Sequence, residues 1–111
     1  MPSPVQQWLI NGNGDLGILN IVAVDEQGTI TATVYGQQAI GFWDDVAKRI
    51  TFTRLINPAD PTTWQTYTGF LIEGTSPVLT GYFDAFSGAG GGAGRFTYGW
   101  KATKGLLLPP R

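Results

Sequence analysis

The sequence predicts an all-β domain, residues 1–111, in which eight antiparallel strands close into an up-and-down barrel. Eight short runs rich in Thr, Val, Ile and aromatic residues follow one another at intervals of about a dozen residues. Their connections are too short for the crossover helix that parallel strands require. Closing the sheet on itself leaves no edge strand exposed, whereas the alternative, a two-sheet sandwich, leaves edges to be covered. The expected strands cover residues 5–10, 17–24, 29–35, 39–43, 49–56, 63–72, 78–86 and 95–103.

The first three runs differ in how clearly they alternate. Residues 5–10 are apolar around Trp8, residues 17–24 are apolar almost throughout, and turns rich in Asn, Asp and Gly follow both. Residues 29–35 alternate instead, with Tyr35 and the threonines on the face opposite the apolar side chains. This alternation predicts a strand with one buried face.

The middle of the chain continues the pattern. Residues 39–43 form a short fourth run, and 44–48 leave room for one helical turn at most. Residues 49–56 alternate, so that their apolar face runs to Ile56. Two prolines in the next loop prevent the ladder from continuing there, and residues 63–72 form the sixth run.

The last two runs flank a glycine tract. Residues 78–86 are apolar apart from Asp84, which either faces solvent or lies in a pocket. The tract at 87–94 has the spacing of a phosphate-binding loop, but a strand-like segment follows it, whereas phosphate binding requires a helix N-terminus. We therefore expect a hairpin loop or a lid over the barrel mouth. In residues 95–103 one face carries Phe96, Tyr98, Trp100 and Ala102.

The composition excludes several classes of function. Seven basic and eight acidic residues give a formal net charge of -1, and the basic residues are scattered. Nucleic-acid binding requires clustered positive charge, so we expect no nucleic-acid partner. The sequence has no Cys and no His, which removes disulfides, thiolate and imidazole metal sites, and nucleophile–histidine pairs. The adjacent acidic residues Asp25-Glu26 and Asp44-Asp45 fall in expected turns, and neighbours on a strand point to opposite faces, so neither pair forms a catalytic dyad. We therefore expect no enzyme and no catalytic residue. We also expect no metal and no cofactor.

The sequence also shows no targeting signal. No basic segment followed by an apolar stretch opens the chain, and no apolar run approaches the ~18 residues that span a membrane. We therefore expect a soluble cytoplasmic protein without a membrane partner.

Several motifs, in order, resemble the avidin and streptavidin family of calycin-type barrels. Trp8 followed by Asp15-Leu16-Gly17 is similar to the first hairpin of that family, and Gly28-Thr29-Ile30-Thr31-Ala32-Thr33-Val34-Tyr35 is similar to its third strand. Thr66-Tyr67-Thr68-Gly69 resembles the sixth strand, and Trp100-Lys101-Ala102-Thr103 resembles the Trp-Lys segment before the last strand. The resemblance implies an eight-stranded barrel with a ligand pocket.

Most of the positions that hold biotin in that family are not matched. The Asn, Ser and Tyr that bind the ureido oxygen fall on Gly14, Ile18 and Val34, and no Asp follows Trp100. Each missing hydrogen bond to a buried ureido group costs roughly 1–3 kcal/mol. We therefore expect no tight binding of biotin.

Seven residues are candidate ligand contacts, because small-molecule sites combine apolar walls with a few polar groups. Trp64 follows the proline-containing loop, and Trp100 falls on the capping-Trp motif, whose indole reaches a neighbouring subunit in the family. The alternative is that the aromatic side chains only fill the barrel. The candidates are Asn11, Asn13, Tyr35, Trp43, Trp64, Tyr67 and Trp100.

Two functions are open at this stage. The first is a non-enzymatic barrel that holds an apolar or amphipathic small molecule. The second is a structural or protein-interaction module whose filled barrel assembles with copies of itself, and we expect a homo-oligomer, either a dimer or a tetramer. A cavity of roughly 300 Å³ or more favours binding, whereas a lumen packed with side chains beside an apolar surface favours assembly.

Overall fold

The computed structural model describes residues 4–86 and 95–104. The glycine tract at 87–94, expected as a loop or lid, and the side chain of Phe96 lie outside the described residues.

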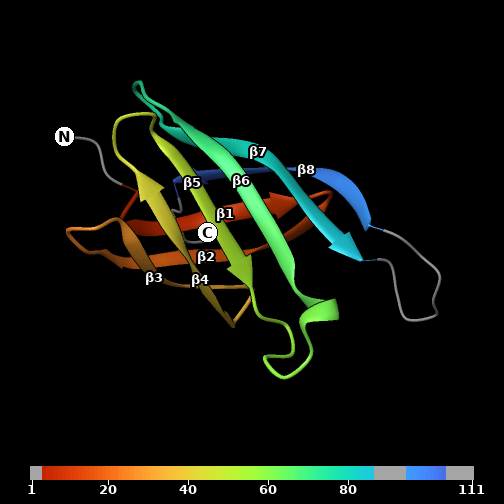
Figure 1. Ribbon diagram of the computed structural model, residues 1–111. Coiled ribbons are helices and arrows are strands. Elements are labelled where there is room, and N and C mark those ends of the chain that lie inside the picture. The colour runs from red at the N-terminus through yellow and green to blue at the C-terminus, as the bar shows by residue number, and fades with distance from the viewer. Residues whose placement is uncertain (1–3, 87–94, 105–111) are drawn as a thin grey trace.

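The described chain forms a closed barrel of eight antiparallel strands in sequence order (Figure 1). Closure is made by the first and last strands, where Ile10 lies opposite Ala102. The predicted barrel is therefore confirmed, and the sandwich alternative is wrong. The strands are β1 (Gln6–Gly12), β2 (Asp15–Val24), β3 (Thr29–Val34), β4 (Gln37–Asp44), β5 (Arg49–Arg54), β6 (Gln65–Ile72), β7 (Val78–Phe86) and β8 (Arg95–Lys104).

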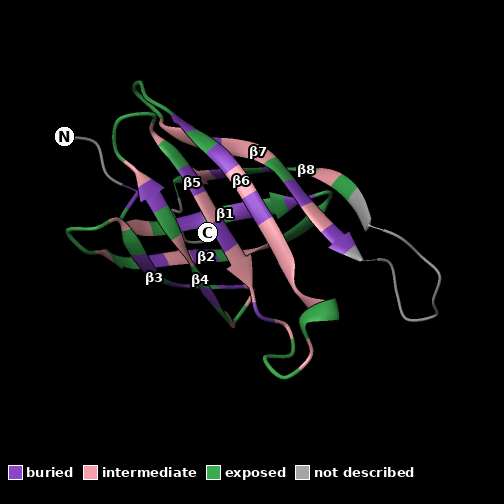
Figure 2. Ribbon diagram, in the orientation of Figure 1, coloured by how far each residue is buried: buried purple, intermediate pink, exposed green. Residues whose placement is uncertain are grey.

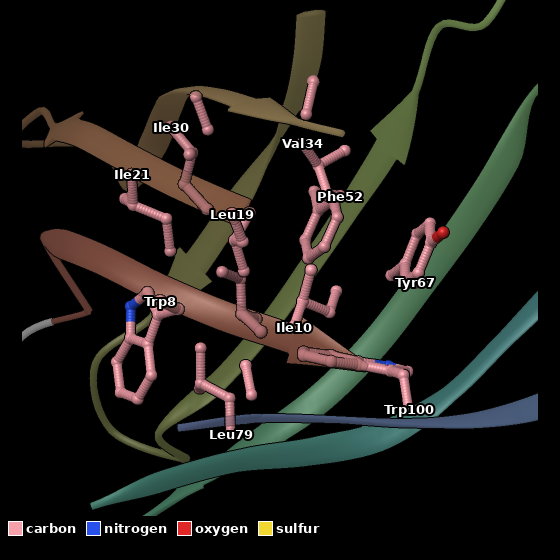
Figure 3. Packing of buried hydrophobic residues seen from close by; sticks show 14 of the residues in the cluster. Trp8, Ile10, Leu19, Ile21, Ile30, Val34, Phe52, Tyr67, Leu79 and Trp100 are labelled. Atoms are coloured by element: carbon pink, nitrogen blue, oxygen red, sulfur yellow. The ribbon is translucent and has the colours of Figure 1, made fainter. Parts of the chain in front are cut away.

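Side-chain alternation creates the core, as Figure 2 shows along each ribbon. In β3 the apolar side chains Ile30, Ala32 and Val34 are buried while the intervening threonines are exposed. The inward-facing side chains of all eight strands form one hydrophobic cluster. Figure 3 shows Trp8, Ile21 and Leu79 toward one side of this cluster, and Phe52, Tyr67 and Trp100 toward the other.

Turn chemistry corrects several expected boundaries. The first turn is only the pair Asn13-Gly14, with φ of 53° and 97°, so β1 and β2 extend further than expected. Positive φ at both central residues defines the mirror-image turn that matches strand twist, and Asn-Gly is its preferred sequence. At the other boundary, β5 ends at Arg54, and Leu55 is buried in place of the expected Ile56. Residues 45–48 form a turn, and the helical turn lies at Pro61–Thr63 instead.

The strand directions define two different ends of the barrel. We call the end where β1 begins the apolar end; it carries the turns between β2 and β3, β4 and β5, and β6 and β7. Pro4 is fully buried there, and the indole Nε1 of Trp8 donates to its carbonyl oxygen at 2.9 Å. We call the opposite end the polar end; it carries Asn13-Gly14, Tyr35-Gly36 and the 55–64 loop with its helical turn (Figure 1). The helical segment at Pro61–Thr63 is far too short to span a membrane, and no other helix occurs in the described residues.

Candidate ligand-binding site

Tyr35 lies at the polar end because the chain turns there with a left-handed residue. β3 ends at Val34, and Tyr35 takes φ of 53°, which moves its side chain from the outer row onto the barrel rim. Its ring packs directly over Gly17, where a Cβ atom would collide with ring carbons. The hydroxyl accepts from the Gly12 N–H at 3.1 Å and donates to the Asp15 carbonyl at 2.6 Å. The expectation that Tyr35 shares the outer face with the threonines is wrong, because alternation stops where the turn begins.

Arg54, the last residue of β5, lies against this ring. Its guanidinium carbon is 4.5 Å from the centroid of the Tyr35 ring, within the range of a cation–π contact. Nε donates to Oε1 of Gln37 at 2.7 Å, and Nη1 donates to Oε1 of Gln65 at 3.0 Å. The Gln65 oxygen also accepts from the Tyr67 hydroxyl at 2.9 Å. The guanidinium is therefore oriented by two neutral amides and one ring.

An aromatic stack lies beneath this polar group. The rings of Phe52 and Tyr67 are 4.7 Å apart and nearly parallel, and Phe83 stacks on the other face of Tyr67 at 4.6 Å. Trp100 meets Phe52 and Tyr67 edge-on, each at 5.8 Å. Tyr98, which is only partly buried, tilts against Phe83 at 5.4 Å. Offset-stacked and edge-to-face pairs of this kind contribute about 0.5–1.5 kcal/mol each beyond their buried area, so the stack is a rigid floor.

Trp100 is held inside the barrel by the adjacent strand β7 and by β6 beyond it. Its Nε1 donates at 3.1 Å to the carbonyl oxygens of both Thr68 and Tyr82. The indole crosses the wall at Gly69, where an added Cβ would lie 2.5 Å from the ring atom Cζ2. Trp100 is 3% exposed, so nearly all of its surface is covered within this chain.

Both phenols of the site are protonated at neutral pH, as an unperturbed phenol also is, and burial raises the pKa of each further. Desolvation raises the pKa of Tyr35, although its hydrogen bond from Gly12 acts in the opposite direction. Desolvation also raises the pKa of Tyr67 to about 12, against the lowering effect of Arg54. Both hydroxyls are therefore hydrogen-bonding groups rather than bases, and the site is suited to binding.

The structure brings together three of the seven predicted contacts: Tyr35, Tyr67 and Trp100. Asn11 faces outward and its side-chain oxygen accepts from the Gly14 N–H, and Asn13 forms the same exposed turn. The other two predicted tryptophans, Trp43 and Trp64, take no part in the aromatic stack.

Trp43 is buried at the apolar end, where its Nε1 donates to Asp45 at 3.2 Å. Trp64 lies on the loop at the polar end, and its Nε1 donates to the Asn57 carbonyl, which ties the loop to itself. Asp84, left open by the sequence, belongs to the outer row and accepts from the Thr97 hydroxyl at 2.9 Å.

Four further residues belong to the site but were not predicted from the sequence: Gln37, Arg54, Gln65 and Phe83. Alternation was the available signal for Arg54, which lies on the same face as Phe52 and Ile50, two and four residues earlier. Phe83 likewise lies on the inner face of β7, together with Gly81 and Ala85 two residues to either side. The two glutamines carry the same signal, since Gln37 lies two residues before the buried Ala39 and Gln65 two residues before the buried Tyr67.

The comparisons with known proteins return no match among protein-family models, curated proteins or solved structures. The resemblance to the avidin family therefore stays a prediction. Within residues 4–86 and 95–104, no group of three or more acidic side chains is arranged to hold a metal ion.

Proposed function

We propose that this chain is a non-enzymatic barrel that binds an amphipathic small molecule at its polar end. The observation that carries the proposal is the convergence of five part-buried or buried polar side chains on an aromatic floor. Ligand sites have this composition, and the mouths of β-barrels are a common place for them. The five are Tyr35, Gln37, Arg54, Gln65 and Tyr67.

The lumen is packed with side chains, which by itself favours assembly and leaves no room for a central ligand, so a ligand would have to bind at the rim. Phe52, Tyr67, Phe83 and Trp100 occupy the barrel beneath the rim, and each is at most 6% exposed. An apolar part of the ligand would pack against the less buried Tyr98 and Tyr35, while its polar part would meet the amides and Arg54. The ligand is thus expected over the stack and not inside the barrel.

Tryptophan fluorescence tests this proposal, because Trp100 contacts Tyr67 directly. A variant with Trp43→Phe and Trp64→Phe removes two of the four indoles, so that Trp100 dominates any change at the polar end. We expect at least one of biotin, fatty acids and aromatic metabolites to change its emission with saturation. The absence of any change across this panel, together with no copurifying ligand in native mass spectrometry, contradicts the proposal.

A second candidate function, self-assembly, is favoured by an uncharged row on the outer surface. Phe42, Thr51, Thr68 and Tyr82 lie side by side across β4, β5, β6 and β7. The two aromatic side chains at its ends are 51% and 50% exposed. An uncharged row can meet its own copy about a two-fold axis without like-charge repulsion within the row, as isologous dimers do.

Oligomeric state decides this second candidate. We expect Phe42→Glu to dissociate the assembly in analytical ultracentrifugation. Val46→Glu, at a turn residue that is 95% exposed at the apolar end, is the matched control and should leave the mass unchanged. A wild-type protein that is monomeric at every concentration rules out assembly through this row.

A further inference from the structure

We propose that the ligand of the polar end is a small organic carboxylate whose anionic group is bound by Arg54. This inference rests on the proposed function and adds the chemical class of the ligand. It begins from the charge of Arg54, which the protein does not balance.

The charges at the two ends are handled differently. At the apolar end Arg49 lies 3.3 Å from Asp44, and Lys48 lies 3.3 Å from Asp45. These are the ion pairs among the described residues, and Arg54 takes part in neither. It is nevertheless part-buried, and its guanidinium cannot lose its proton to escape the cost of desolvation. A positive charge held in this way favours an anion that arrives from solution.

Asp15 is the acidic residue whose charge is felt at the site, but it does not act as a counter-ion for Arg54. The charge of Asp15 acts on both phenols of the site, yet Asp15 is exposed and makes no ion pair with Arg54 within the described residues. The main-chain carbonyl of Asp15 instead accepts a hydrogen bond from the Tyr35 hydroxyl. Within the described residues, the positive charge of Arg54 is therefore not neutralised by a carboxylate.

The contacts around Arg54 also fix the orientation of its guanidinium group before a ligand binds. Nε and Nη1 are engaged by Gln37 and Gln65, and one face of the guanidinium lies on the Tyr35 ring. Arg54 also makes a side-chain hydrogen bond with Tyr67, which lowers the pKa of that phenol. A fixed guanidinium loses little side-chain entropy on binding, and its planar arrangement of donors matches a carboxylate.

The identity of residue 65 sharpens the inference. Gln65 bridges Arg54 and Tyr67 through one amide oxygen, so a glutamate at this position would make the same two hydrogen bonds and also neutralise the guanidinium. Gln65→Glu is therefore an internal competitor for the ligand. It differs from the native side chain by little more than one charge.

The test uses pairs of probes that differ only in charge: phenylacetate and phenylacetamide, indole-3-acetate and indole-3-acetamide, octanoate and octanamide. Titrations of the full chain are followed by tryptophan fluorescence and calorimetry. We expect the acid of at least one pair to bind about tenfold or more tightly than its amide. In Arg54→Gln and in Gln65→Glu the ratio should fall to about one. Arg49→Gln, which removes a cation at the apolar end, should leave the ratio unchanged.

The outcomes separate the two proposals. Equal binding of acid and amide leaves the proposed function standing and overturns the carboxylate. Binding of no probe by the wild type overturns the carboxylate, and it overturns the proposed function as well when the wider fluorescence panel and native mass spectrometry are also negative. Tighter binding of inorganic phosphate than of every acid overturns the carboxylate in favour of a phosphate ester. Because Arg54→Gln also removes hydrogen bonds, urea unfolding is measured for each variant, and Gln65→Glu alone decides the matter if Arg54→Gln does not fold.

Discussion

The two ends of the barrel use polar groups in opposite ways. At the apolar end the core reaches the rim: Pro4 covers Trp8, and the nearby charged groups pair with one another on the surface. At the polar end a guanidinium, two amides and two phenols lie on top of an aromatic stack, with neutral groups as partners for the cation. The apolar end is thus closed by packed side chains, whereas the polar end holds the polar side chains that we propose as the ligand site.

The largest expected effect breaks the comparison at the apolar end. Trp8→Ala removes a side chain that is 1% exposed and leaves the Pro4 carbonyl without its donor, so the free energy of unfolding should fall by about 3–5 kcal/mol. Trp64→Ala, on the loop at the polar end, is the matched control and should cost clearly less, since Trp64 is only partly buried. Urea unfolding measures both. Equal losses would show that the two ends contribute alike.

A smaller effect is expected where the aromatic stack rests on the barrel wall. Gly69→Ala places a Cβ 2.5 Å from Trp100 and 2.9 Å from the Thr80 carbonyl, which should destabilise the fold by roughly 1–3 kcal/mol and shift the Trp100 emission. Gly99→Ala is the control, because its Cβ would meet only the Gly81 carbonyl at 3.9 Å. It should be neutral or slightly stabilising. If both variants behave alike, Trp100 does not lie across Gly69.

The free energy of unfolding should fall at alkaline pH because of Tyr67 at the polar end. In the unfolded chain the Tyr67 phenol loses its proton near pH 10, whereas in the fold it keeps the proton to about pH 12. Between these values only the unfolded state is ionised, so the free energy of unfolding falls as pH rises, by up to about 2 kcal/mol. Tyr67→Phe should flatten this slope and remove the late step of tyrosinate absorbance. A variant with an unchanged slope would assign the shift to another group.

The smallest expected effect refines the picture of the apolar end. The Gln6 side chain faces inward from β1, and its buried Nε2 has no hydrogen-bond partner among the described residues. Gln6→Leu should therefore stabilise the fold by about 1 kcal/mol, because an unsatisfied buried amide is replaced by an apolar group. Thermal unfolding of the two proteins measures this. A loss of stability would mean that the amide is satisfied in solution.

The strands were predictable from the sequence because alternation and turn chemistry are local. The range of β7 is the same in the prediction and in the structure, and the inner face of β3 was assigned correctly. The site was less predictable because it depends on departures from alternation and on distant partners. Tyr35 reaches the rim only through its left-handed φ, and Arg54 meets amides 17 and 11 residues away in sequence. Charge alone gave no reason to separate Arg54 from solvated cations such as Arg49.

The most direct test of the account is a map of backbone amide chemical shifts during titration with the carboxylate that binds best in the fluorescence panel. We expect the shifts to concentrate at the polar end, at Gly12, Gln37 and Gln65, while the amides of Gly28 and Gly74 at the apolar end stay unchanged. Shifts centred on the apolar end, or on the outer row of Phe42 and Tyr82, would contradict it.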